Sequence, residues 1–558
     1  MSQHRSRTRR RPFRLAAAGA VTALAVLLAA CSGAASPATE GAGGDPVSGG
    51  TLSIAFRADN TSLVSIDPFQ VYWLEHRVVI RNVVESLTDQ DPETGEIIPW
   101  LAESWEVSDD GLRYTFHLRD DVTFSNGEAF DATAVQTAFD ANRDFAAENP
   151  TTFGATYIAG YDHAEIVDDH TITLVLDSPN AAFLQATSTT NLSILAPESY
   201  TRTADERSQG DIIGSGPFVL EEYSPEERIV LTKREGYAWA SAASENQGEA
   251  YLDEVEITYV PEANVRNGSF QSGDLDIVWP REPFTDADLA LLESVGGTIQ
   301  SRSLPGPSWA YYANVQEGKI LNDDLVRQAL QLSIDRESYA STIYNADFDI
   351  VEGPYDQTTP YFSSQADKLA YDPDRAADLL DEAGWELGDD GYRYKDGERL
   401  TLVRLLQAES TGEVLVQDQL KQVGIDLELR VLVAGEYNAA QAAGDYDLTS
   451  SYMTRADPVI LQTILDPRYT DSAIAVNAYK PEQLETVQDL FDAGLTELDT
   501  EARGEIYAEL QAYLIDENIS FPVYERLWQA ATASDVHGFE WTSEGFALLN
   551  DIWLSDQE

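Results

Sequence analysis

Short strand patterns and amphipathic helix patterns alternate from Thr51 to the C-terminus, which is typical of an α/β body. Residues 112–118 alternate apolar and polar side chains after an Asp110-Gly111 turn, and residues 171–176 and 255–260 alternate in the same way. Each of these segments can therefore bury one face of a strand. We expect a hairpin at Asp110-Gly111 and further strands between helices.

The helix patterns carry their own start and stop signals. Asp372 is a cap residue, Pro373 stands at the first helical position, and Gly384 ends the pattern. Another helix pattern ends at Gly424 and leads directly into a strand pattern at residues 425–429. A helix that leads into a strand in this way is expected in an α/β lobe.

The charge balance limits the partners of the chain. Its 96 acidic and 36 basic residues give a formal net charge of −60, which argues against nucleic acid as a partner. Hydrophobic residues make up 43% of the chain, enough for a sizeable core, so the acidity does not indicate disorder. At roughly 100–200 residues per domain, the length predicts about three or four units or one large multi-lobed body.

The N-terminus indicates export. Arginines precede an apolar run from Leu15 to Ala30, which is shorter than the ~20 residues of a membrane-spanning helix. The run ends in Leu28-Ala29-Ala30-Cys31, which resembles a bacterial lipobox. We therefore expect residues 1–31 to be a lipoprotein signal peptide, Cys31 to receive lipid, and residues 32–50 to be a flexible tether. Export by the general or the twin-arginine route stays open, and an ordinary small apolar residue is the alternative for Cys31.

Sequence motifs for catalysis are missing. No phosphate-binding loop, nucleophile elbow or zinc-protease helix pattern occurs, and Cys31 is the only cysteine, which excludes disulfides within the chain. We expect no catalytic residue, no metal site and no cofactor. The many close pairs of carboxylates keep a secreted glycosidase open as an alternative.

Two dense motifs carry a family resemblance. Residues 98–111 (IPWLAESWEVSDDG) and 118–127 (LRDDVTFSNG) resemble the signature of the extracellular solute-binding proteins of family 5, the peptide- and nickel-binding components of ABC importers. Further matches follow in family order, among them Gly214-Ser215-Gly216-Pro217-Phe218 and Asp457-Pro458. Essentially all of residues 49–558 is covered.

The resemblance implies an α/β, two-lobed, periplasmic-binding-protein-like fold of the large class, with an extra subdomain and a ligand cleft between the lobes. Mapped by motif order, lobe one would comprise residues 50–85, 205–300 and 525–558. The extra subdomain would comprise residues 86–204, and lobe two residues 301–524.

The resemblance also implies where the ligand binds. Trp309, Tyr311 and Tyr312 occupy a stretch that approaches the cleft in relatives, and strand alternation would place Tyr312 on the opposite face from the other two. Core and cleft positions both stay open for these aromatic residues. The second candidate stretch is the run before Asp457-Pro458, whose candidate ligand-binding residues are Tyr452, Thr454, Arg455 and Asp457.

Peptide-binding relatives carry an Asp before the Asp-Pro step that pairs with the ammonium group of the ligand. Thr454 stands three residues before Asp457 here, which puts that contact in doubt. Arg455 would instead favour an anionic or carboxylate-bearing group by bidentate pairing. The residue types in this stretch therefore differ from those of the peptide-binding pattern.

The resemblance implies a membrane-anchored substrate-binding protein of an ABC importer that has no catalysis of its own. We expect it to bind di- or oligopeptides, to deliver them to the permease subunits, and to act as a monomer held at the outer face of the membrane by lipid on Cys31. Oligosaccharides are the alternative ligand class. A receptor that signals in response to peptide pheromones is a third alternative.

Overall fold

The computed structural model describes residues 44–58, 65–281, 283–345, 348–470 and 472–555. The predicted signal peptide, Cys31 and the tether up to residue 43 lie outside the described residues. In the part of the chain that is described, no helix is both long enough and apolar enough to cross a membrane.

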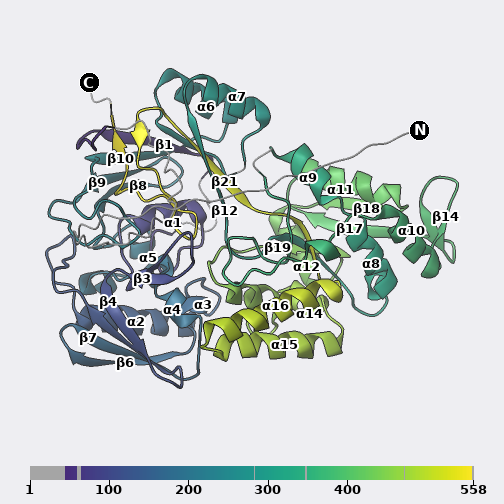
Figure 1. The fold of residues 1–558 in the computed structure, drawn as a ribbon, viewed down its shortest axis with the longest axis horizontal. Coiled ribbons are helices and arrows are strands. Elements are labelled where there is room, and N and C mark those ends of the chain that lie inside the picture. The colour runs from purple at the N-terminus through teal and green to yellow at the C-terminus, as the bar shows by residue number, and fades with distance from the viewer. Residues whose placement is uncertain (1–43, 59–64, 282, 346–347, 471, 556–558) are drawn as a thin grey trace, which may run out of the picture. The chain divides into compact units, whose positions relative to one another are not determined.

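A seven-stranded sheet holds together segments that are far apart in the sequence (Figure 1). The central strand pairs in parallel with β10 and β11, whereas the outer pairs are antiparallel. In spatial order the strands are β12 (Thr298–Ser303), β21 (Leu527–Thr532), β11 (Ile277–Trp279), β1 (Thr51–Phe56), β10 (Glu254–Tyr259), β9 (Arg228–Lys233) and β8 (Phe218–Ser224).

Apolar side chains cover both faces of this sheet. On one face, α1 (Leu74–Arg81) and the C-terminal segment, which includes β22 (Val536–His537) and β23 (Trp553–Leu554), share a hydrophobic cluster with the sheet. On the other face, α6 (Ala263–Ser272) and α7 (Asp286–Ser294) pack against alternate residues of the same strands. The strands are therefore apolar on both sides, as parallel strands in α/β folds are.

A five-stranded sheet forms the second body. Its parallel part follows the strand, helix, strand order that the Gly424 stop signal predicts, with α11 between β17 and β18. In spatial order the strands are β18 (Asp426–Val431), β17 (Thr401–Leu406), β19 (Leu448–Ser451), β13 (Trp309–Ala313) and β20 (Ser520–Tyr524).

Helices cover both faces of the five-stranded sheet (Figure 1). One face packs against α8 (Asp324–Leu332), α9 (Arg336–Ile343), α10 (Pro373–Glu382) and α11 (Thr411–Gln422). The other packs against α13 (Gln462–Leu465), α14 (Ala473–Asn477), α15 (Pro481–Thr496), α16 (Thr500–Asp516) and the 3₁₀ helix η5 (Pro458–Leu461). Helix α12 (Ala434–Ala442) and the small sheet of β14 (Glu386–Leu387), β15 (Arg393–Lys395) and β16 (Glu398–Arg399) complete this body.

The predicted caps of α10 are confirmed. The Asp372 side chain accepts a hydrogen bond from the Arg375 amide, Pro373 is the first helical residue, and Gly384 has a φ of +84°. Only a residue without Cβ takes that backbone conformation without strain, which is why the helix pattern ends there.

A smaller four-stranded antiparallel sheet with its own hydrophobic cluster forms the third body. The predicted hairpin at Asp110-Gly111 is confirmed, because β4 and β5 pair on either side of it. The strands in spatial order are β4 (Ala102–Val107), β5 (Arg113–Leu118), β7 (Thr171–Leu176) and β6 (Tyr161–Asp168). The remaining elements are α2 (Ala132–Glu148), α3 (Ala155–Ile158), α4 (Phe183–Ala186), α5 (Ala204–Ser208), β2 (Thr88–Gln90) and β3 (Ile97–Pro99).

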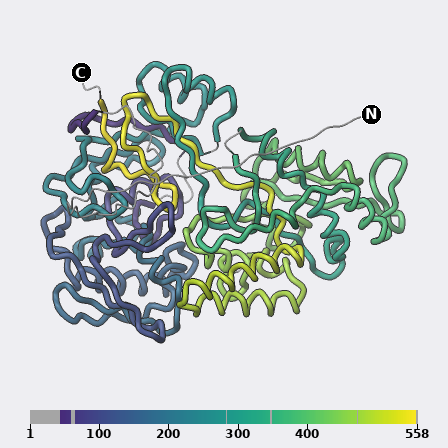
Figure 2. Tube along the Cα trace, in the orientation of Figure 1, coloured from purple at the N-terminus to yellow at the C-terminus, as the bar shows by residue number. Residues whose placement is uncertain are grey.

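Two segments join the seven-stranded and five-stranded sheets. One leads from β12 to β13, and the other, yellow in Figure 2, leads from β20 to β21. The Leu304 amide donates a hydrogen bond to the Arg526 carbonyl over 2.8 Å, so the two segments run side by side. The structure thus brings the two bodies together at residues 304 and 526, and the exact lobe boundaries stay a prediction.

Candidate functional site

A cavity of about 200 Å³ lies where the two connecting segments pass between the sheets. We call it the interlobe cavity. Apolar and aromatic side chains from both sheets line it, and its charged lining residues, among those described, are arginines. The lining residues are Leu74, Arg281, Pro283, Leu304, Trp309, Tyr344, Phe348, Tyr452, Tyr524, Arg526, Leu527 and Trp528.

The five-stranded sheet supplies a stacked aromatic wall to this cavity. The Trp309 ring stacks on Tyr524 with centroids 4.9 Å apart, and Tyr339 also stacks on Tyr524 at 5.3 Å. Tyr344 and Phe348 form a second stack at 3.9 Å. Burial raises the pKa of the Tyr524 hydroxyl well above its ordinary value, so the wall is neutral across the physiological pH range.

The seven-stranded sheet supplies the opposite wall. Leu74 stands at the start of α1, Leu527 and Trp528 begin β21, and Arg281 follows the carboxyl end of β11. Ligands of α/β proteins commonly bind beyond the carboxyl ends of parallel strands. Arg281 therefore occupies a position from which a side chain can reach a ligand.

Arg526 lines the cavity, and its guanidinium holds the surrounding segments together by hydrogen bonds. Its guanidinium donates hydrogen bonds to Thr454 Oγ1 over 2.8 Å and to the carbonyls of Met453, Pro305 and Pro307 over 2.7, 3.3 and 3.3 Å. Burial lowers the pKa of Arg526, although the group keeps its charge at neutral pH. Because these bonds engage all three of its nitrogens, Arg526 ties the connecting segments to the residues after β19.

Two carboxyl groups lie next to this arginine. Asp356 and Glu525 are buried beside each other, and burial raises the pKa of both. Two carboxylates in such contact cannot both be ionised, so the pair shares a proton near neutral pH. The pair therefore offsets the charge of Arg526 with only one negative charge.

A small extension of about 20 Å³ adjoins the interlobe cavity and shares Leu74, Arg281 and Tyr452 with it. Arg77 lies at this extension, and its side chain is 1% exposed. It pairs with Glu544 over 2.7 Å and donates to the Thr454 carbonyl over 3.4 Å. Arg77 thus adds positive charge near the cavity while its own bonds are occupied.

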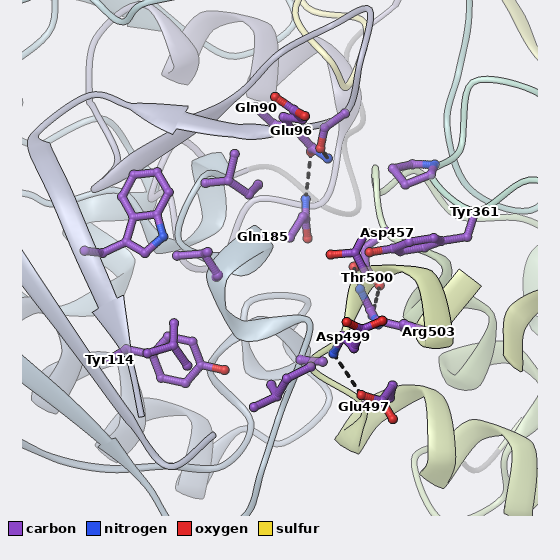
Figure 3. A pocket seen from close by; sticks show the side chains of 18 of the residues that line it. Gln90, Glu96, Tyr114, Gln185, Tyr361, Asp457, Glu497, Asp499, Thr500 and Arg503 are labelled. Carbon is purple, nitrogen blue, oxygen red and sulfur yellow. Dashed lines mark hydrogen bonds and ion pairs between the residues drawn. The ribbon is translucent and has the colours of Figure 1, made fainter. Parts of the chain in front are cut away.

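A larger hollow of about 1020 Å³, which we call the groove, lies between the four-stranded sheet and α16 (Figure 3). Two of its polar side chains, Arg503 and Gln90, are already bonded within the protein. Arg503 donates to both oxygens of Asp457 over 2.9 Å, and Gln90 donates to the carbonyls of Gly95 and Ala456 over 3.0 Å. The arginine of the groove therefore has little hydrogen-bonding capacity left for a ligand.

The sequence-predicted site residues separate into two groups. Trp309 and Tyr452 line the interlobe cavity, and Thr454 lines its extension. Tyr311 and Tyr312 are 1% and 0% exposed, and they lie in different hydrophobic clusters on opposite faces of β13, as alternation predicts. Because helices cover both faces of that sheet, the structure gives these two tyrosines core positions.

Arg455 and Asp457 are used elsewhere in the fold. The Arg455 guanidinium donates to Gln185 over 2.8 Å and to the Ala182 carbonyl over 3.3 Å, and it lies 4.3 Å from the Tyr157 ring centroid. At 3% exposed, Arg455 holds the five-stranded body to the four-stranded one through these bonds, and its predicted role as an anion site stays a prediction. Asp457 caps η5 and pairs with Arg503 at the groove.

The sequence reasoning missed the arginines of the interlobe cavity. Arg281 could have been found from its place after an apolar strand, Ile277-Val278-Trp279, whose carboxyl end meets a parallel neighbour. Arg526 follows Glu525 in an otherwise apolar stretch, and such an isolated pair of charges is a signal in itself.

The described residues include no group of three or more His, Cys, Asp and Glu side chains that could hold a metal ion. The described lining of the interlobe cavity likewise includes no acidic side chain. The site therefore offers stacking surfaces and guanidinium donors, which suit reversible binding of a solute.

Comparison with known proteins agrees with these features. The family described as bacterial extracellular solute-binding proteins, family 5 Middle, matches residues 96–470. The dipeptide-binding protein of Escherichia coli is 30% identical over 53% of this chain and 56% of its own length. Heme-binding protein A of Haemophilus influenzae is 29% identical over 55% and 57%, so the chain spans little more than half of these two relatives. The nickel-binding periplasmic protein of E. coli is 24% identical over 77% and 81%.

Solved structures share the fold. NikA from Brucella suis, in complex with Fe(III)-EDTA, superposes with a TM-score of 0.77 and 24% identity over 91% of this chain and 100% of its own. DppA from Helicobacter pylori, in complex with the peptide STSA, gives a TM-score of 0.68 and 24% identity over 91% and 99%. The predicted two-lobed α/β fold of the periplasmic-binding-protein class is thereby confirmed.

Proposed function

We propose, from the premise that the chain belongs to family 5 of the bacterial extracellular solute-binding proteins, that it binds short peptides in the interlobe cavity and delivers them to the permease of an ABC importer. It would do so as a monomer without catalysis of its own. The observation that carries this proposal is the aromatic, arginine-bearing cavity at the junction of the two bodies.

We expect the two lobes to close by a rotation at the two segments that connect the sheets. Only the segments around Leu304 and Arg526 join β12 to β13 and β20 to β21, and a rotation there would widen or close the cavity between them. Lobe one would comprise residues 50–85, 205–300 and 525–558, the extra subdomain residues 86–204, and lobe two residues 301–524. Trp309, Tyr452 and Thr454 would lie at the closing surfaces.

Peptides are the ligand class that the relatives and the cavity favour together. The dipeptide-binding protein and the peptide complex of DppA are relatives whose names state a peptide ligand. The stacked rings of Trp309 and Tyr524 would hold an apolar or aromatic side chain. A volume of about 200 Å³ lies below the ~300–1,000 Å³ of typical small-molecule pockets, which favours di- over oligopeptides.

Thermal unfolding in the presence of dipeptide and oligosaccharide panels tests the ligand class. A peptide at about 100 times its dissociation constant would stabilise the protein by about 2.7 kcal/mol. Stabilisation by oligosaccharides alone would replace the peptide proposal, and turnover of chromogenic glycosides would replace the receptor by a glycosidase. Peptide uptake that persists without the gene would instead favour a signalling receptor.

Membrane attachment through Cys31 is a separate part of the proposal. Two acyl chains give stable anchoring where a single chain is marginal. Cys31→Ala should release the protein from the membrane fraction and abolish incorporation of labelled fatty acid, whereas the tether variant Ser36→Ala should do neither. A Cys31→Ala protein that stays on the membrane would overturn the anchor.

A further inference from the structure

Positive charge is concentrated at the interlobe cavity of a chain whose net charge is −60. Arg281 and Arg526 line the cavity, and Arg77 lines its extension. The described lining residues of both spaces include no Asp, Glu or Lys. A cavity of this sign favours a ligand with a negative group.

Arg281 is the arginine with donors to spare. Its Nη1 lies 3.4 Å from Glu75, longer than the ~2.7–2.9 Å of a well-formed charge-assisted bond. Its Nε and Nη2 have no hydrogen-bond partner among the described residues, and its side chain is 25% exposed. Arg281 can therefore present two donors of its planar fork to a carboxylate.

The Trp73 ring holds this guanidinium in place. Arg281 lies 3.6 Å from the ring centroid of Trp73, so the planar group is stacked before a ligand arrives. Such support reduces the side-chain entropy that binding would otherwise remove. A lysine at this position could supply the charge but not the stacked fork.

The other two arginines do not compete for this role. Arg526 bonds Thr454 and three carbonyls, and Arg77 bonds Glu544 and the Thr454 carbonyl. The donors of both are used within the protein, and a carboxyl group lies beside each of them. Thr454 is in turn occupied by both arginines, so it is a poor acceptor for a ligand ammonium group.

We propose that Arg281 is the carboxylate anchor of the interlobe cavity, and that the preferred ligand is a carboxylic acid with an apolar or aromatic body and no free ammonium group, such as an N-acylated short peptide. This inference rests on the proposed peptide-binding function and specifies the chemistry at both ends of the ligand. The aromatic wall takes the body, and the guanidinium takes the carboxylate.

Four related ligands test the carboxylate end and the ammonium end of the ligand separately. Phe-Ala, N-acetyl-Phe-Ala and the C-terminal amides of both differ only in ammonium and carboxylate, and calorimetric titration measures each affinity. The wild-type protein should bind each acid at least about tenfold more tightly than its amide, since a charge-assisted pair is lost. N-acetylation should not weaken binding.

Variants of Arg281 test whether the preference for an acid over its amide depends on this side chain. In Arg281→Gln, the acid-to-amide ratio should fall to about one, and Arg281→Lys should retain part of it. Arg228→Gln is the matched control, because Arg228 pairs with Glu222 and Glu256 in the same sheet at 43% exposure and should leave the ratio unchanged. Using a ratio removes any general loss of folded protein from the comparison.

Several results of these titrations would contradict the proposal. Equal binding of acids and amides by the wild-type protein, or an unchanged ratio in Arg281→Gln, would overturn the carboxylate anchor. Weaker binding on N-acetylation would overturn the preference for a ligand without a free ammonium group. Each of these results would leave peptide binding intact. Failure of all four ligands to bind would overturn the proposed peptide function and this inference with it.

Discussion

The interlobe cavity and the groove differ in how many hydrogen-bond donors their arginines have free for a ligand. The groove is the larger of the two, at about 1020 Å³ against about 200 Å³. Its Arg503 is bonded to both oxygens of Asp457, whereas Arg281 of the cavity touches Glu75 at 3.4 Å with one nitrogen. A binding site thus depends on hydrogen-bonding capacity that the fold leaves unused, and volume alone does not provide it.

The two regions also differ in how acids balance the arginines. Asp457 faces Arg503 as a one-to-one pair with side chains 4% and 6% exposed. Arg526 has instead the buried pair of Asp356 and Glu525 beside it, and the raised pKa values of these two carboxyls indicate that they share a proton. Arg503 and Arg526 are thus each balanced by about one negative charge, and the positive charge that the cavity offers a ligand is that of Arg281, whose contact with Glu75 is 3.4 Å long.

The largest effect should come from breaking the ion pair of the groove. Asp457→Asn leaves the buried Arg503 charge without a charged partner but keeps an oxygen that can cap η5, so the free energy of unfolding should fall by about 3–5 kcal/mol through the broken ion pair. Denaturant unfolding measures this loss. The affinity of the remaining folded protein for a dipeptide should not change.

Asp492→Asn is the matched control for that variant. Asp492 pairs with Arg468 at the surface, with side chains 50% and 42% exposed, so its loss should cost at most about 1 kcal/mol. Equal costs for the two variants, or a loss of dipeptide affinity in Asp457→Asn, would mean that the groove takes part in binding.

A smaller effect, on affinity instead of stability, should follow from truncating the aromatic wall. Trp309→Ala removes the ring that stacks on Tyr524 and should weaken dipeptide binding by about 2 kcal/mol, or about 30-fold. Trp105→Ala removes a half-buried ring from the groove and should leave affinity unchanged. Calorimetric titration compares the two, and a larger loss in Trp105→Ala would reverse the assignment of the site.

Much of the fold was predictable because local signals and tertiary packing agree. The hairpin at Asp110-Gly111 and the α10 caps are local. The motif glycine at 214 is a packing signal, since a Cβ there would lie 2.1 Å from the Val83 carbonyl oxygen. Alternation placed Tyr311 and Tyr312 on opposite faces of β13, but it could not tell that helices cover both faces.

The site was less predictable because partners far along the chain decide whether a side chain is free. Arg455 is occupied by Gln185, 270 residues away in sequence. No local sequence pattern predicts that contact. Arg281 differs, since the rule for the carboxyl ends of parallel strands points to it once its strand is known to pair in parallel. The strand topology, more than the residue type, distinguishes the predictable position of Arg281 from that of Arg455.

The smallest expected effect tests the shared proton beside Arg526. Burial raises the pKa of Asp356 and Glu525, so the folded state holds a proton that the unfolded chain releases above its ordinary pKa values of ~3.9 and ~4.3. The pair's contribution to stability is therefore full below about pH 4 and is lost as pH rises toward the raised pKa values.

Glu525→Gln replaces the protonated carboxyl by an amide that can donate to Asp356 at every pH. Its free energy of unfolding should match the wild type near pH 4 and exceed it by about 1 kcal/mol at pH 5, because one proton costs ~1.4 kcal/mol per pH unit above the ordinary Glu pKa of ~4.3. Denaturant unfolding across this range measures the difference, and Glu222→Gln, at an exposed surface pair, should run parallel to the wild type. A parallel curve for Glu525→Gln as well would mean that both carboxyls are ionised. The pair would then carry two negative charges beside the single positive charge of Arg526, and the cavity would be less favourable for an anionic ligand.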